Sequence, residues 1–312
     1  MKIAYIFPGQ GTQVVGMGKD LYEKYDEVKN IYKRVDDALG ENVENITYNI
    51  SQEELNETKN TQIAIYTMSM AILEILNKKG IKPDVSAGLS LGEYSALVCS
   101  NVLSLEEGAK IVRKRGKIMQ ELAPKGDWLM AAIIGLEDDK VEETCSKVEK
   151  GFVRAVNYNC PGQVVISGEK EAVLRAMNIA KDMGAKKVIE LKTTGPFHTE
   201  KLQEASNSLR KELGKVQFNK FEIPVMKNIN GEIYDEIDNM IDILAKHVMN
   251  PVKFRKSIEN MLDMGIDTFV EIGPGKTLSG FVKKVCKEKE REVRIFNIEN
   301  VETLEKYIEY IN

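Results

Sequence analysis

Hydrophobic and polar positions follow two different spacings along the chain. Short apolar runs over residues 2–7 and 85–89 predict buried strands. Apolar residues three and four apart predict helices over residues 60–79 and from Ser104 to Leu122. The same patterns predict helices over 18–39, 197–213, 238–248, 252–264 and 277–288, and strands over 223–229, 267–272 and 293–297. Strands alternating with helices indicate an α/β fold with a mainly parallel sheet covered on both faces.

A different order of elements lies between two Gly- and Pro-containing joints, at residues 123–127 and 193–197. The patterns there predict strand, helix, strand, strand, helix and strand, over 128–134, 138–150, 152–158, 162–168, 170–183 and 187–191. The order βαββαβ is that of the ferredoxin-like split unit. We therefore expect an inserted ferredoxin-like subdomain over 126–194, and a core that combines residues 1–125 with 195–312.

The composition narrows the class of protein. Of the 312 residues, 43% are apolar and 29% are charged, and the net charge is −4, which argues against a nucleic-acid-binding protein with its basic surface. The sequence has no apolar run of about 18 or more residues, so it predicts no membrane span. The N-terminus lacks the pattern of a signal peptide. The four cysteines have no metal-ligand spacing, so we expect a cytoplasmic protein with reduced cysteines and no metal.

Two glycine-containing turns resemble nucleotide-binding motifs but lack their spacing. Gly9-Gln10-Gly11 begins like a dinucleotide-binding fingerprint, but Val14 stands where the third glycine belongs. Gly275-Lys276-Thr277 resembles the end of a phosphate-binding loop, but Val270 stands at the position of its first glycine. We therefore expect neither a nicotinamide cofactor nor ATP.

The chemistry that the sequence suggests begins at Ser90. The pentapeptide Gly88-Leu89-Ser90-Leu91-Gly92 has the form G-x-S-x-G and lies between a predicted strand and a predicted helix. In this context the serine occupies a sharp turn with its hydroxyl exposed, as a nucleophile requires. The backbone N–H of Leu91 can then help to bind an oxyanion. An ordinary serine at a helix start is the alternative.

A serine nucleophile needs a base, and the chain has only two histidines. His198 follows Gly195-Pro196, which predicts a helix start, and shares an apolar stripe with Leu202 and Leu209. A helix N-terminus disfavours imidazolium, so the ring should stay neutral and able to accept a proton. We expect His198 to be the base, with a buried structural histidine as the alternative, and His247 to be structural or supporting.

Arg115 lies on the apolar stripe of the helix that begins after Ser104. An arginine cannot lose its charge, and burying it unpaired costs several kcal/mol, so it needs an anion. An internal Asp or Glu could supply that anion. Beside a serine nucleophile, an acyl substrate that carries a carboxylate is the stronger interpretation.

These residues lie in segments that resemble the malonyl-CoA:acyl-carrier-protein transacylases of type II fatty-acid synthesis and the acyltransferase domains of polyketide synthases. The matching segments are FPGQGTQVVGMG (7–18), GLSLGEYSALV (88–98), RKRGKIMQ (113–120), AAIIGL (131–136), VNYNCPGQVVISG (156–168), GPFHT (195–199), NPVKF (250–254) and EIGPGKTLSGF (271–281). They span almost the whole chain in family order. The resemblance implies an α/β-hydrolase-like core with an inserted ferredoxin-like subdomain, in agreement with the patterns.

The resemblance also implies a reaction. Ser90, with His198 as its base, would take a malonyl group from malonyl-CoA and pass it to the phosphopantetheine thiol of an acidic acyl carrier protein. Backbone N–H groups of Gln10 and Leu91 would form the oxyanion hole, and Arg115 would bind the malonyl carboxylate. Further expected substrate-binding residues are Gln62, Gln163, Phe197 and His247. We expect no cofactor and a monomeric protein.

Two positions depart from the family pattern. Leu89 stands where the family usually has a histidine, and His247 stands where it commonly has a glutamine. The position of Leu89 is not that of the base, so we expect this replacement to be tolerated with a change of local polarity. In the family, the second residue orients the catalytic histidine through its main-chain carbonyl, which any residue can supply, so we expect the pair of Ser90 and His198 to be kept. Three alternative functions stay open: a discrete acyltransferase of a polyketide synthase, a serine esterase or thioesterase, and a non-catalytic carrier-protein-binding subunit.

Overall fold

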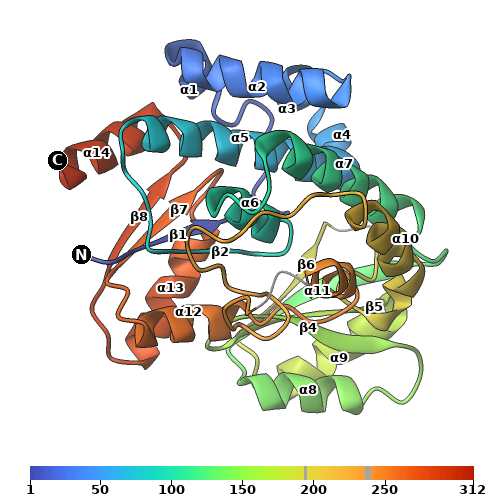
Figure 1. The fold of residues 1–312 in the computed structure, drawn as a ribbon. Helices are drawn as coiled ribbons and strands as arrows, with labels where there is room; N and C mark the ends of the chain where they lie inside the picture. The colour runs from blue at the N-terminus through green and yellow to red at the C-terminus, as the bar shows by residue number, and fades with distance from the viewer. Residues whose placement is uncertain (193–194, 236–239) are drawn as a thin grey trace.

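The computed structural model describes residues 1–192, 195–235 and 240–312. Two β-sheets lie among packed helices (Figure 1). The larger part of the chain surrounds a four-stranded sheet of order β2-β1-β7-β8, in which every neighbouring pair is parallel. Its strands are β1 (Ile3–Phe7), β2 (Val85–Gly88), β7 (Thr268–Ile272) and β8 (Arg294–Ile298). The predicted mainly parallel core sheet is confirmed.

Different helices bury the two faces of this sheet. Successive side chains of a strand point to opposite faces. Tyr5 and Phe7 of β1 accordingly join an apolar cluster with α5 and α7, whereas Ala4 and Ile6 join a second cluster with α12 and α13. These helices are α5 (Thr58–Lys78), α7 (Leu105–Glu121), α12 (Phe254–Asp263) and α13 (Thr277–Glu288). Burial on both faces explains why the strands are continuous apolar runs in the sequence.

The second sheet is antiparallel and has the order β4-β5-β3-β6. Its elements follow one another as β3 (Trp128–Ile134), α8 (Asp138–Ser146), β4 (Val153–Cys160), β5 (Gln163–Glu169), α9 (Lys170–Asp182) and β6 (Lys187–Leu191). Helices α8 and α9 bury one face over a separate apolar cluster. On the opposite face, Met130, Ala132 and Val165 join the main core. The predicted βαββαβ unit is confirmed.

The limits of the two parts stay a prediction. The expected boundary at residues 194/195, and part of the joint at 193–197, lie outside the described residues. The same holds for the expected start of a helix at residue 238, and the described helix is α11 (Met240–His247). The last helix, α14 (Val301–Ile311), packs against β8.

Several predicted elements were wrong in extent. The helix expected over 18–39 is two helices, α1 (Lys19–Lys24) and α2 (Asp26–Leu39), because the backbone at Tyr25 is extended. The helices α3 (Val43–Tyr48) and α4 (Gln52–Leu55) were not predicted. The strand expected over 223–229 consists only of isolated bridges at Val225 and Met226.

The helix expected from residue 197 was also wrong in its start. A single 3-10 turn, η1 (Glu200–Leu202), precedes α10 (Gln203–Leu213). His198 therefore lies outside the helix, and its backbone has a φ of 61°. The neutral ring expected from a helix N-terminus needs a different physical cause.

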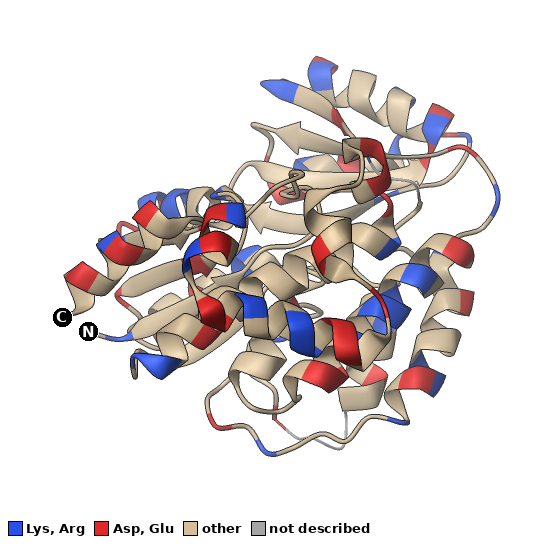
Figure 2. Ribbon diagram, turned by 90° about the horizontal axis from the view of Figure 1, so that it is seen from above, with Lys and Arg blue, Asp and Glu red and all other residues tan. Residues whose placement is uncertain are grey.

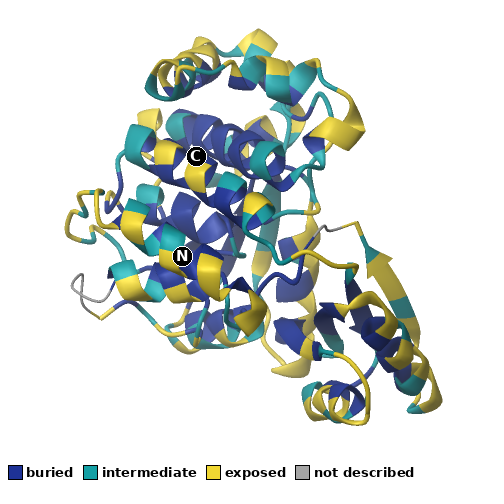
Figure 3. Ribbon diagram, turned by 90° about the vertical axis from the view of Figure 1, so that its right-hand side faces the viewer, coloured by how far each residue is buried: buried dark blue, intermediate teal, exposed yellow. Residues whose placement is uncertain are grey.

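Charge and burial separate the outside of the molecule from its interior. Lys and Arg are interspersed with Asp and Glu on the outer helices (Figure 2). Buried residues gather along the inner helices and the sheets, and exposed residues lie on the outer surfaces (Figure 3). Among the described residues, no helix is both long and apolar enough to cross a membrane.

Candidate active site

Ser90 occupies the turn between β2 and α6 (Gly92–Cys99) at the carboxyl end of a core strand. Its φ of 54° lies in the left-handed region that serine rarely adopts. The flanking glycines are needed for space, because a Cβ at Gly88 would collide with the backbone of Gly92, and one at Gly92 with the backbone of Phe7. The turn has the strained geometry of a nucleophile elbow.

Asn228 holds this strained turn in place. The backbone N–H of Ser90 donates to Asn228 Oδ1 at 2.7 Å, and Asn228 Nδ2 donates to the carbonyl oxygen of Gly88 at 2.6 Å. Sequence reasoning missed Asn228, because it lies in a segment predicted as a strand and 138 residues from Ser90.

The His198 ring lies next to the Ser90 hydroxyl, with 2.9 Å between Nε2 and Oγ. On its other side, Nδ1 lies 3.0 Å from the carbonyl oxygen of His247 and 3.2 Å from that of Asn250. Carbonyl oxygens only accept hydrogen bonds, so Nδ1 carries the proton of the neutral ring. Nε2 is then free to accept the hydroxyl proton of Ser90.

The surroundings of His198 favour this neutral form. Burial lowers the pKa of His198 well below its ordinary value of 6.5, and the neighbouring His247 and Arg115 lower it further. Burial therefore takes the place of the helix N-terminus that the sequence suggested. An uncharged imidazole is the form that can act as a general base.

Arg115 places its guanidinium on the other side of the same hydroxyl. Its Nη2 donates to Ser90 Oγ at 3.0 Å, and its Nη1 donates to Gln62 Oε1 at 2.7 Å. The side chain is fully buried, its Cζ lies 5.6 Å from the centre of the Tyr94 ring, and its Nε has no partner among the described residues. Over the same residues, no carboxylate lies within ion-pair distance of Arg115. Burial lowers the pKa of Arg115, although the charge of buried Glu93 partly opposes this lowering.

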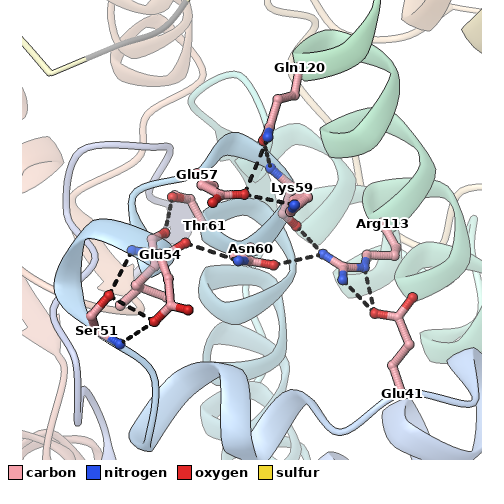
Figure 4. A network of polar contacts seen from close by, with 10 residues as sticks. Glu41, Ser51, Glu54, Glu57, Lys59, Asn60, Thr61, Arg113 and Gln120 are labelled. Atoms are coloured by element: carbon pink, nitrogen blue, oxygen red, sulfur yellow. Dashed lines mark hydrogen bonds and ion pairs between the residues drawn. The ribbon is translucent and has the colours of Figure 1, made fainter.

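Polar contacts link α5, which carries Gln62, to α7, which carries Arg115 (Figure 4). Arg113 donates from Nη1 to the carbonyl oxygen of Lys59 at 2.6 Å and from Nε to Glu41 at 2.8 Å. Gln120 accepts the backbone N–H of Lys59 at 3.1 Å. The helices approach so closely that a Cβ at Gly116 would lie 2.9 Å from Lys59 Cα.

A cavity of about 530 Å³ opens in front of Ser90 and His198. Its lining combines the turns that follow β1 and β2 with strands of the second sheet, among them Met130 and Ala132 of β3. Other expected site residues on its lining are Gln10, Gln62, Leu91, Gln163 and Phe197. The backbone N–H groups of Gln10 and Leu91 donate no hydrogen bond within the described chain, which leaves both able to bind an oxyanion.

His247 does not line this cavity, although we expected it to bind substrate. Its side chain is fully buried behind His198, and the two ring centres are 5.2 Å apart. The geometry therefore supports a role for its carbonyl oxygen and not a substrate contact. Sequence reasoning also missed Asn250, which contributes a second carbonyl, and Glu93, a buried acid that approaches the His247 ring.

Fold and site together define a class of protein. A serine hydroxyl lines a cavity large enough for an acyl chain, between a neutral imidazole that also lines it and a buried guanidinium that lies outside the lining. This arrangement suits nucleophilic acyl chemistry on a thioester or ester that also carries an anion.

Comparisons with known proteins identify the family. The sequence profile described as "Acyl transferase domain" matches residues 4–305, so the chain belongs to the acyl transferase family. It is 40% identical over 310 residues to the malonyl CoA-acyl carrier protein transacylase of Bacillus subtilis (strain 168), covering 99% of this chain and 96% of the relative.

Solved structures agree with this assignment. The crystal structure of malonyl CoA-acyl carrier protein transacylase from Clostridium perfringens has a TM-score of 0.94 and 44% identity, and the match covers 100% of this chain and 97% of that one. A malonyl-transacylase in complex with a type II polyketide synthase acyl-carrier protein also has a TM-score of 0.94, with 34% identity, covering 99% and 100%. The predicted fold class is confirmed.

Proposed function

We propose that this chain is an [acyl-carrier-protein] S-malonyltransferase of fatty-acid biosynthesis. It takes the malonyl group of malonyl-CoA onto Ser90 and passes it to the phosphopantetheine thiol of acyl carrier protein. The observation that carries the proposal is the buried Arg115 fork, 3.0 Å from Ser90 Oγ and with no carboxylate at ion-pair distance among the described residues. Such a fork suits an acyl group that ends in a carboxylate.

The first half-reaction forms a malonyl-serine ester. Arg115 binds the malonyl carboxylate, and His198 Nε2 takes the hydroxyl proton as Ser90 Oγ attacks the thioester carbonyl. The N–H groups of Gln10 and Leu91 stabilise the negative charge on the carbonyl oxygen. The C–S bond then breaks, and CoA leaves as a thiol with the proton from His198.

The second half-reaction reverses these steps with a different thiol. His198 takes the proton of the phosphopantetheine thiol, whose sulfur attacks the malonyl-serine carbonyl. The C–O bond breaks, and Ser90 regains its proton from His198. We propose that neither a metal nor a redox cofactor takes part. Exchanging an acyl group between sulfur and oxygen changes no oxidation state, so the reaction needs no redox cofactor.

A discrete acyltransferase that serves a polyketide synthase is the second candidate. The observation that favours it is the 34% identical malonyl-transacylase solved with a type II polyketide synthase acyl-carrier protein. Transfer rates to carrier proteins of both pathways distinguish the two. An esterase would not need Arg115, and any turnover with carrier protein would exclude a non-catalytic binding subunit. We also propose that the protein acts as a monomer in the cytoplasm, where its four free cysteines would stay reduced.

Intact-protein mass spectrometry tests the proposal. Incubation with malonyl-CoA should add one malonyl group to the wild-type chain, and added carrier protein should remove it. Ser90→Ala is the matched control and should stay unlabelled. A labelled Ser90→Ala variant would show that another residue is the nucleophile, and equal labelling by acetyl-CoA would argue against a malonyl-specific site.

A further inference from the structure

Glu93 is a buried carboxylate close to the catalytic pair. It is the second residue of α6, three positions after Ser90, and its side chain is 1% exposed. Burying a carboxylate is costly unless nearby groups compensate for its lost hydration. The groups around Glu93 therefore indicate what it does.

One oxygen of Glu93 is connected to the nucleophile turn. Glu93 Oε1 accepts the backbone N–H of Asn228 at 3.3 Å. The side chain of Asn228 is the one that binds the Ser90 N–H and the Gly88 carbonyl. Glu93 thus contacts the residue that holds the strained nucleophile turn.

The other oxygen is connected to the base. Glu93 Oε2 lies 3.0 Å from His247 Nδ1, within ion-pair distance although the two groups are not aligned as a hydrogen bond. The carbonyl oxygen of the same His247 accepts from His198 Nδ1. The position of His247 therefore bears directly on the orientation of His198.

We infer that Glu93 is a positioning residue. It holds the nucleophile turn of Ser90 in place relative to His247, whose carbonyl oxygen accepts the hydrogen bond from His198. The inference rests on the proposed acyl transfer, and Glu93 itself touches neither substrate nor the reacting atoms. A change at Glu93 releases Asn228 and His247 together, and misaligns Ser90 with His198. In an ordinary triad the acid contacts the catalytic histidine directly, whereas here it acts through a neighbouring residue.

The test compares a variant that changes the carboxylate itself with a variant that removes only one of its contacts. Glu93→Gln keeps the shape of the side chain but removes its charge. Tyr234→Phe removes the third contact, a hydrogen bond from Tyr234 to Glu93 Oε1 at 2.7 Å, and leaves both connections to the dyad. Both are measured for melting temperature, for kcat and KM with malonyl-CoA, and for the rate at which a fluorophosphonate probe labels Ser90.

We expect Glu93→Gln to lower kcat and the labelling rate by about 10- to 100-fold with KM unchanged. This is the range typical for loss of a group that orients a functional side chain from behind. Tyr234→Phe should lower the melting temperature about as much as Glu93→Gln does. Its rate of Ser90 labelling should fall much less. Parallel losses in the two variants, or wild-type labelling of Glu93→Gln, would overturn the inference.

A second pair of variants keeps the inference testable if Glu93→Gln does not fold. His247→Leu removes the ring from Glu93 but keeps the main-chain carbonyl, whereas His247→Gln keeps a polar group there. His247→Leu should label more slowly than His247→Gln, and equal rates would refute the connection to the base. The probe needs neither malonyl-CoA nor carrier protein, so a wild-type chain that takes the probe but no malonyl group would contradict only the proposed function.

Discussion

The two sides of Ser90 are built from different kinds of group. On one side, main-chain carbonyls of His247 and Asn250 hold His198, whose own backbone lies outside any helix. On the other side, the side chain of Gln62 holds Arg115 between two packed helices. Any residue can supply a carbonyl, but only arginine supplies a fixed, forked cation. The residues that supply these carbonyls should therefore tolerate substitution more readily than Arg115, and the anion side should decide which acyl group is accepted.

Of the changes on the two sides of Ser90, removing the base should slow the reaction most. We expect His198→Ala to slow the formation of malonyl-enzyme by about 10²–10⁴-fold, because general-base catalysis typically contributes that much. The loss should be similar for malonyl-CoA and acetyl-CoA, since the base contacts neither acyl tail. Rapid-quench mass spectrometry with both thioesters measures it. An unchanged rate would assign the base to another residue.

Removing the Arg115 cation should affect transfer from malonyl-CoA far more than transfer from acetyl-CoA. Truncating one partner of a buried charge pair costs about 2–5 kcal/mol, so Arg115→Ala should lower kcat/KM for malonyl-CoA by about 30-fold or more. Acetyl transfer should be spared, because acetyl has no carboxylate. Lys117→Ala, which removes a half-exposed cation from the same helix, is the matched control. Equal losses for malonyl and acetyl transfer would refute the carboxylate-binding role.

The charge of Arg115 should also affect the pKa of His198, and through it the pH dependence of activity. The lowered pKa of His198 keeps its ring neutral, so activity should fall only as pH drops through that pKa, well below 6.5. The charge of Arg115 contributes to the lowering, so Arg115→Ala should raise the pKa of His198 and move the acidic limb of kcat/KM to higher pH. Acetyl-CoA is the substrate for this profile, since the variant keeps acetyl transfer. A limb that stays in place would show that the two sides are independent.

Local patterns in the sequence were enough to predict part of the site. The elbow glycines follow from the strand–serine–helix context, and Arg115 is detectable as a charge on an apolar stripe. The antiparallel unit was predictable because its strands and helices have distinct periods over about 60 residues. In each case, the signal lies in the spacing of residues along one continuous segment of the sequence.

Residues that act through distant contacts were not predictable. Asn228 matters because its segment, 138 residues from Ser90, meets the nucleophile turn. Glu93 is only three residues from Ser90, but its partners Asn228 and His247 are far along the chain, and no spacing marks either contact. His198 was predicted for a physical reason that proved wrong, since α10 begins only at Gln203. Its neutrality comes from burial, a property of the whole fold that a local helix start does not report.

The smallest expected effect concerns the contacts that hold α5 against α7. Arg113→Ala removes the side-chain donor to the carbonyl of Lys59 and to one oxygen of Glu41, although Lys117 still contacts Glu41 at 2.8 Å. We expect the free energy of unfolding to fall by about 1–2 kcal/mol. Denaturant unfolding at neutral pH measures this change.

The same variant shows how far specificity depends on helix packing. If Gln62 and the close approach at Gly116 are enough to orient Arg115, the ratio of malonyl to acetyl transfer in Arg113→Ala should stay near that of the wild type. A stable variant with a collapsed ratio would mean that the outer contacts of α7 help to aim the guanidinium. The anion side would then depend on packing across two helices, in contrast to a base that main-chain carbonyl oxygens hold directly.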